Sequence, residues 1–325
     1  MSKIEKYPHM QQILDEIHSS EGLPENLSTE AQLWDEILKK EAFLMPEQLF
    51  PLIKEIHGKD YPMDTPVKPL ATEYSIERGD TKKISSIRAD ITIVVAEYDI
   101  YHFECEFKND HTMVLRMFEY DAHIALSYRT IPDQLPNGSR PEIALHFPHS
   151  AVLYLEDNGS LPKELSCTIH FQDGSSHIYR IPTIRVQSYS LEYIKKKHLC
   201  VLIPFLPLRF RKKQGITKKE ELTSFYQELI LILDKEVADG YLSETNRKAI
   251  LSLLGKSMIR VFYRNKTLLK EVVRMTEPIL ELEFEKTEKL EKYYKGLVAD
   301  LQAENEEKQA KINELKRQLA ELQKL

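Results

Sequence analysis

The sequence predicts an α/β (α+β) protein with a mixed β-sheet flanked by helices, a helical C-terminal region and a terminal coiled coil. Apolar residues follow a helical period over most of the first 60 residues and an alternating, strand-like period over residues 85–108. Helical periodicity returns at 112–128 and beyond Lys218, and a heptad pattern occupies the C-terminus. The 325 residues, 42% of them hydrophobic, suffice for a substantial core.

Composition excludes several classes of protein. With 45 Lys and Arg against 51 Asp and Glu, the formal charge is −6. No apolar run reaches the 18 residues that a membrane span needs, and the polar N-terminus lacks the features of a secretory signal. The three cysteines show no CxxC spacing, which favours buried thiols over a disulfide framework or a zinc site. We therefore expect a soluble, cytoplasmic protein.

The N-terminal 60 residues predict helices. LSTEAQLWDEILKKEAFL has apolar residues near helical spacing. In the following segment, Pro46 suits a first helical turn and Gly58 suits a C-cap. The Pro-marked connection YPMDTPVKP then separates this region from the strands.

Residues 85–108 predict a β-hairpin with one apolar and one charged face. A loop at residues 97–99 would place Asp90 opposite Glu106, with Glu104 on the same face. A helix over 112–128 follows, with Met113 and Met117 on its core side and Arg116 and Tyr120 in a polar stripe. The run 151–155 predicts a strand, and Asp173-Gly174 a second hairpin.

The heptad pattern at the C-terminus predicts a dimer. Helices are expected beyond Lys218, and residues 298–322 fit a heptad in which six of eight seam positions are apolar. A single solvated amphipathic helix is the alternative. We expect a homodimer formed through the coiled coil.

The charged strand face is the first candidate site. Asp90, Glu104 and Glu106 would lie on one face of the hairpin with Lys108 next along, and facing like charges destabilise a hairpin. A hard divalent cation with oxygen ligands would neutralise them. Charges on a solvent-exposed strand face are the alternative interpretation.

The residues around this face narrow the interpretation. RADITIVV…YHFECEFKNDHTMVLRMFEYDAHIAL resembles the PD-(D/E)XK nuclease superfamily and, more narrowly, the Rpn-type recombination-promoting nucleases, a group also described as PD-(D/E)XK transposases. In that group an Asp opens the first strand of a hairpin, Glu-x-Gln or Glu-x-Lys occupies the second, and a helix with Arg and Tyr four apart follows. Asp90, Glu104 and the Arg116/Tyr120 pair match these positions. The resemblance covers roughly residues 40–210.

The resemblance implies a restriction-endonuclease-like fold and metal-dependent hydrolysis of DNA phosphodiesters. Asp90 and Glu104, with Glu106, would hold Mg²⁺, or alternatively Mn²⁺. Lys108 would orient water or neutralise the transition state, and Glu73 is a further candidate ligand or base for which Glu77 competes. Arg116 and Tyr120 would contact a phosphate or brace the acidic cluster.

One position departs from the pattern. Glu106 stands where the group has Gln or Lys. Either Lys108 supplies the positive charge from the next position on the same face, or the site is altered and its activity reduced. The second reading leaves a catalytically degenerate nuclease fold that acts as a DNA-binding or coiled-coil interaction module.

The segment 178–219 carries a net charge of +10, from eleven basic residues and one acidic residue. Such a segment can track a phosphate backbone, or simply be a solvated surface. The candidate DNA-binding residues in it are Lys195, Lys196, Lys197, Arg211, Lys212 and Lys213. The predicted organisation is an N-terminal helical segment (1–40), a nuclease-like core (40–215), a helical region (216–275) and the coiled coil (276–325).

Overall fold

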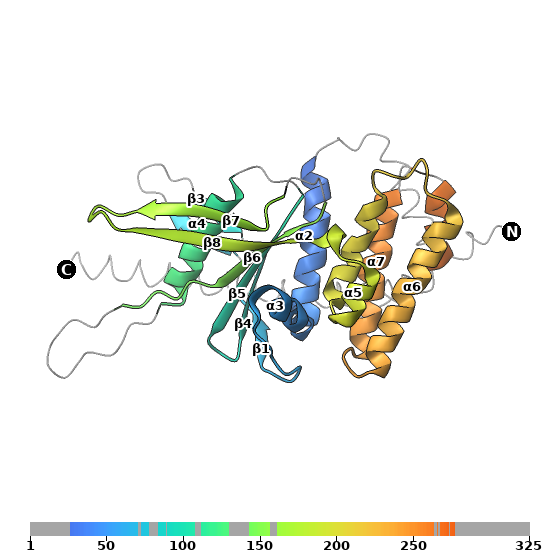
Figure 1. Ribbon diagram of the computed structural model, residues 1–325, viewed down its shortest axis with the longest axis horizontal. Coiled ribbons are helices and arrows are strands. Elements are labelled where there is room, and N and C mark those ends of the chain that lie inside the picture. Colours follow the sequence, from blue (N-terminus) through green and yellow to red (C-terminus); the bar gives the residue numbers. More distant parts are fainter. Residues whose placement is uncertain are drawn as a thin grey trace, which may run out of the picture. The chain divides into compact units, whose positions relative to one another are not determined.

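A computed structural model describes residues 27–70, 73–77, 84–88, 90–107, 112–129, 143–156, 161–262, 265, 267–272 and 274–276 (Figure 1). The coiled coil predicted for 276–325 lies outside these residues, of which Thr276 is the last. None of the described helices combines the length and apolar character that a membrane crossing requires.

The N-terminal helices form where the sequence predicts them. Helix α2 spans Leu27–Leu44, the 3₁₀ helix η2 spans Pro46–Leu49, and α3 spans Phe50–His57. Pro46 occupies the first turn of η2, where its missing N–H is not needed. Gly58 ends α3 with a left-handed φ of 70°, a conformation that glycine adopts without steric cost.

A mixed sheet of six strands forms the centre of the fold, as predicted. Its order is β1-β4-β5-β6-β8-β7, in which β5–β6 and β6–β8 are parallel and the other pairs antiparallel. The strands are β1 (Val67–Pro69), β4 (Ile91–Val95), β5 (Asp99–Glu106), β6 (His149–Tyr154), β7 (Glu164–His170) and β8 (Ser176–Arg185). A separate hairpin, which the sequence analysis missed, pairs β2 (Glu73–Glu77) with β3 (Ile84–Arg88).

The register of the β4–β5 hairpin differs from the prediction. The turn consists of residues 96–98, one position earlier than expected, because Ala96 and Glu97 adopt left-handed φ values of 50° and 70°. Ile91 therefore pairs with Phe103. Continuing this pairing by one residue places Asp90 opposite Glu104, and not opposite Glu106. The pairing shifts by two residues, so every side chain keeps its predicted face.

Helices cover both faces of the central strands, so the alternative interpretation of a solvent-exposed strand face is wrong. Helix α4 (Met113–Ser127) packs Met113 and Met117 against Val152 and Tyr154 of β6. On the opposite face α2 contacts β4 and β5, and Figure 1 shows α4 and α2 on opposite sides of the sheet. The charged face is therefore an interface between β5 and α4.

The chain beyond Lys218 is helical, as predicted, and two helical segments that the sequence analysis did not predict precede it. Helix α5 spans Leu191–Lys196, the 3₁₀ segment η4 spans Cys200–Phe210, α6 spans Lys219–Ala238 and α7 spans Glu244–Phe262. Pro204 and Pro207 lie inside η4, and proline disrupts the hydrogen-bond ladder of an α-helix. Nearly all of η4 is buried, and it contacts both α2 and α7. It thereby joins the sheet layer to the C-terminal helices.

Candidate active site between β5 and α4

Three carboxylates lie at neighbouring positions of the β4–β5 hairpin. Asp90 directly precedes β4, while Glu104 and Glu106 belong to β5 and point to the face that α4 covers. Asp90 and Glu104 are 7% and 5% exposed, and Glu106 is half-buried. In the observed register Asp90 lies beside Glu104. The prediction of a metal site depends on these two residues.

Asp90 donates one hydrogen bond to β5 and accepts another from it. Its backbone N–H donates to Oε1 of Glu104 at 2.7 Å, and its own Oδ2 accepts from the backbone N–H of Cys105 at 3.0 Å. Nζ of Lys39, on α2, lies 3.4 Å from Oδ1 of Asp90. The Asp90 carboxylate is thus held by one strand neighbour and one lysine.

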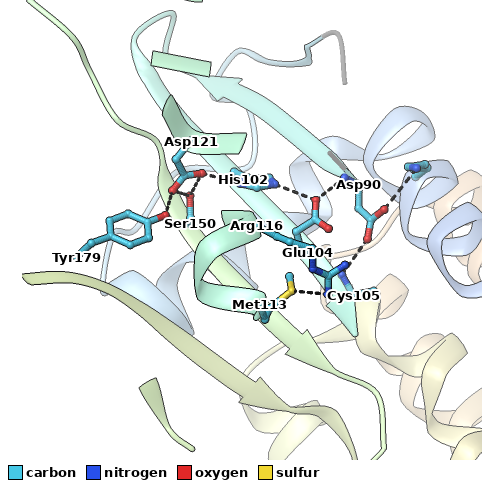
Figure 2. A network of polar contacts seen from close by, with 10 residues as sticks. Asp90, His102, Glu104, Cys105, Met113, Arg116, Asp121, Ser150 and Tyr179 are labelled. Atoms are coloured by element: carbon cyan, nitrogen blue, oxygen red, sulfur yellow. Dashed lines mark hydrogen bonds and ion pairs between the residues drawn. The ribbon is translucent and has the colours of Figure 1, made fainter. Parts of the chain in front are cut away.

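His102 links Glu104 to α4. Its Nε2 lies 3.0 Å from Oε1 of Glu104, and its Nδ1 lies 2.7 Å from Oδ1 of Asp121 on α4. Figure 2 shows the two contacts of His102, whose side chain is fully buried. A single imidazole therefore bridges two buried carboxylates.

Asp121 is itself held by two further strands. The Ser150 hydroxyl, on β6, lies 2.7 Å from each carboxylate oxygen of Asp121. The Tyr179 hydroxyl, on β8, donates to Oδ2 (Figure 2). Burial and the neighbouring Asp121 charge raise the pKa of Tyr179, so its phenol remains a donor. A continuous polar chain thus runs from β8 to Glu104.

The charge on His102 follows from its two carboxylate neighbours. Burial alone would lower the pKa of His102, but its hydrogen bonds to Asp121 and Glu104 outweigh burial and raise that pKa to about 9. At neutral pH His102 is therefore an imidazolium that donates from both ring nitrogens.

Glu106 pairs with α4 directly. Its Oε2 accepts a hydrogen bond from the Arg116 guanidinium, which also contacts the sulfur of Met113. Tyr120, one turn beyond Arg116, places its ring edge-on to His102, with the ring centroids 5.8 Å apart. Burial and the Glu104 charge raise the pKa of Tyr120, which stays a neutral phenol.

Protein cations accompany the carboxylates of the site. Lys39 lies beside Asp90, His102 beside Glu104, and Arg116 beside Glu106. Among the described residues, no group of three or more His, Cys, Asp or Glu side chains is arranged to hold a metal ion. The arrangement reduces the like-charge repulsion that a face of three acids would otherwise produce.

Two predicted site residues are not described at the level of their side chains. Glu73 lies in β2, where its Cα is paired with that of Arg88. Lys108 lies outside the described residues, two positions beyond the last residue of β5.

The candidate DNA-binding residues fall into two groups. Lys195 and Lys196 end α5, and Lys197 lies 3.3 Å from a carboxylate oxygen of Glu55 on α3. The second group is Arg211, Lys212 and Lys213, which follow η4.

The second group lies near the end of β5. Arg211 and Lys212 approach the Glu156 carboxylate to 2.7 and 3.1 Å. The Arg211 guanidinium also lies over the ring of Phe107, 5.5 Å from its centroid. Because Phe107 directly follows Glu106, Arg211 lies against the chain segment that leaves the carboxylate cluster.

Sequence reasoning missed the inner part of the network, namely Asp121, Ser150, Tyr179 and the bridging role of His102. One signal was present. Asp121 continues the core spacing of Met113 and Met117, and a charged residue at a core position needs a buried partner. The identity of that partner depends on the parallel β5–β6 pairing, in which His102 lies beside Ser150.

Comparisons of the chain with models of known families, with curated proteins and with solved structures found no match.

Proposed function

We propose that this protein is a metal-dependent DNA endonuclease of the PD-(D/E)XK type, with Mg²⁺ or Mn²⁺ as its cation and a role in recombination or mobile elements. The observation that carries the proposal is the hydrogen bond from the backbone N–H of Asp90 to the Glu104 carboxylate, which places two acidic residues side by side in the hairpin. The chain order supports it too, since Asp90 precedes the first strand of a hairpin, Glu104 lies in the second, and α4 with Arg116 and Tyr120 follows. That is the order that the sequence resemblance implies.

The chemistry of the donors fits a hard cation. Carboxylate oxygens are the ligands that Mg²⁺ favours, and Asp90 and Glu104 are neighbouring residues that each carry a carboxylate. The side chain of Lys39 is 40% exposed, so its ammonium can leave Asp90 for solvent when a cation binds. Glu106 would supply a third carboxylate ligand when its side chain releases Arg116 and binds the cation instead.

Each residue has a defined task in the proposed reaction. Asp90 and Glu104, with Glu106, hold the cation, which when bound lowers the pKa of a water and stabilises the charge that develops on the phosphate. Arg116 and Tyr120 offer donors to a phosphate oxygen. Lys108 orients the water or neutralises the transition state. Arg211 and Lys212 bind the DNA backbone near the end of β5.

Nicking of a supercoiled plasmid tests the proposal. We expect the full-length protein to cut with Mg²⁺ or Mn²⁺ and to be inactive in EDTA. Asp90→Asn and Glu104→Gln should abolish cutting. Glu164→Gln is the matched control, because it neutralises an exposed strand carboxylate that pairs only with Arg180 in the described structure. A wild type that is inert with both cations on supercoiled, linear and single-stranded DNA would exclude an endonuclease.

A second candidate is a catalytically degenerate nuclease fold that acts as a DNA-binding or coiled-coil interaction module. The observation that favours it is the protein cation beside each carboxylate, which neutralises the cluster without a metal. Melting temperatures separate the two candidates. An active site should gain thermal stability from Mn²⁺ in the wild type but not in Asp90→Asn, whereas a degenerate site should gain none.

A further inference from the structure

We propose that His102 is a positioning residue for the cleavage reaction, which holds the Glu104 carboxylate in the orientation that binds the cation. This inference rests on the proposed endonuclease function and extends it from the ligands to the residue behind them. It also gives a task to the buried network that the sequence analysis did not identify.

The first argument is the geometry around Glu104. Oε1 of Glu104 is shared by two donors, the backbone N–H of Asp90 at 2.7 Å and Nε2 of His102 at 3.0 Å. Two donors at one oxygen fix the rotation of a carboxylate. The arrangement leaves the second oxygen with a defined direction in which to meet a cation.

The second argument is that His102 cannot turn away. Its other nitrogen lies 2.7 Å from Asp121, which Ser150 and Tyr179 hold from β6 and β8. Rotation of the His102 ring away from Glu104 would therefore also break its contact with Asp121. Outer partners of this kind commonly orient metal-binding carboxylates and histidines.

The third argument is burial. The side chain of His102 is fully buried, and Asp121 is 1% exposed. Neither residue can touch a DNA strand on the surface. Any effect of His102 on cleavage is therefore indirect and passes through its neighbours Glu104 and Tyr120. The Mn²⁺ affinity separates these two routes, because only Glu104 is a candidate ligand.

The decisive experiment measures cation binding apart from catalysis. Mn²⁺ alone is titrated into the full-length protein and followed by the electron paramagnetic resonance signal of the free ion. The variants are His102→Phe, which removes both donors, and His102→Gln, which keeps one amide donor. His149→Phe is the matched control, because His149 is a strand histidine on the opposite face of the sheet. Plasmid cleavage with each variant gives kcat and KM, and circular dichroism checks folding.

We expect His102→Phe to raise the Kd for Mn²⁺ and lower kcat by about 10- to 100-fold, the usual effect of losing an outer partner, with KM for DNA unchanged. His102→Gln should recover part of the loss, and His149→Phe should match the wild type. If folded His102→Phe has the Mn²⁺ affinity and the kcat of the wild type, the inference about His102 is overturned but the endonuclease proposal is not. If His102→Phe does not fold, equal Mn²⁺ affinities of His102→Gln and the wild type would overturn it. A wild type that binds no Mn²⁺ would overturn the endonuclease proposal itself.

Discussion

The backbone N–H of Asp90 donates a hydrogen bond to the side chain of Glu104 at 2.7 Å, so one candidate ligand orients the other. The contact exists because the left-handed turn at Ala96 and Glu97 sets the pairing of the two strands. A change in that turn would alter the relation between the two carboxylates without touching either of them.

Glu104→Gln should cost stability as well as activity. The substitution removes the negative charge beside a buried His102 imidazolium, and breaking a buried ion pair typically costs about 3–5 kcal/mol. Urea unfolding followed by circular dichroism measures the change. The double variant Glu104→Gln/His102→Gln should lose less than the sum of the single losses. Strict additivity would show that the two side chains do not interact.

The Arg116–Glu106 pair should matter more for cleavage than for folding. Both side chains are partly exposed, and pairs of this kind contribute about 0.2–1 kcal/mol to stability. A double-mutant cycle with Arg116→Ala and Glu106→Ala should therefore give a coupling below about 1 kcal/mol in urea unfolding. If Arg116 contacts phosphate, Arg116→Ala should also lower plasmid cleavage by roughly 10²-fold or more. If Arg116→Ala cleaves as fast as the wild type, the remaining role of Arg116 is to stabilise β5 through Glu106.

Arg211→Ala and Lys212→Ala should each lower the salt dependence of DNA binding. A side chain that neutralises one phosphate contributes a slope of about −0.9 in a plot of log K against log salt. Fluorescence anisotropy with a duplex between low and moderate salt measures this slope. Lys235→Ala is the control, since Lys235 is an exposed cation on α6 paired with Asp239. A slope equal to that of the wild type in both variants would exclude phosphate contacts at this surface.

His57 should make the protein less stable in mild acid. Burial, together with the nearby His149 and Lys59, lowers the pKa of His57 to about 4, while an unfolded histidine titrates near 6.5. Below about pH 6.5 the unfolded chain binds the extra proton and the folded protein does not. This contribution to stability therefore declines from about pH 6.5 down to about pH 4. The drop in urea midpoint between pH 7 and pH 5 should be smaller in His57→Phe. An equal drop would assign the acid sensitivity to other groups.

The elements were predictable where local signals agree. Pro46, Gly58 and Asp173-Gly174 each mark a turn or helix end that the structure contains. The mixed sheet followed from the change of hydrophobic period. The hairpin register was not predictable, because it depends on which residues adopt left-handed φ, and Ala96 and Glu97 have no residue-type preference for that conformation.

The candidate site was predictable only in its outline. Alternation along β5 correctly grouped Glu104 and Glu106 on one face, because that grouping needs only the two-residue period. The pairing of Arg116 with the acidic cluster was one of its two expected roles, whereas Lys39 and His102 were not foreseen as partners. Lys39 and Arg116 come from helices on opposite sides of the sheet, and their contacts depend on tertiary packing that a sequence pattern does not encode.

The polar chain behind Glu104 is built from segments that leave the ribosome at different times. Glu104 and His102 emerge first, Ser150 follows, and Tyr179 completes the chain about 75 residues after Glu104. At synthesis rates of about 5–20 residues per second, the interval is roughly 4–15 s. Until β6 arrives, β5 has an unpaired edge, and an unpaired strand edge invites pairing with another chain. During synthesis the edge of β5 is therefore open to pairing with another chain until β6 has emerged.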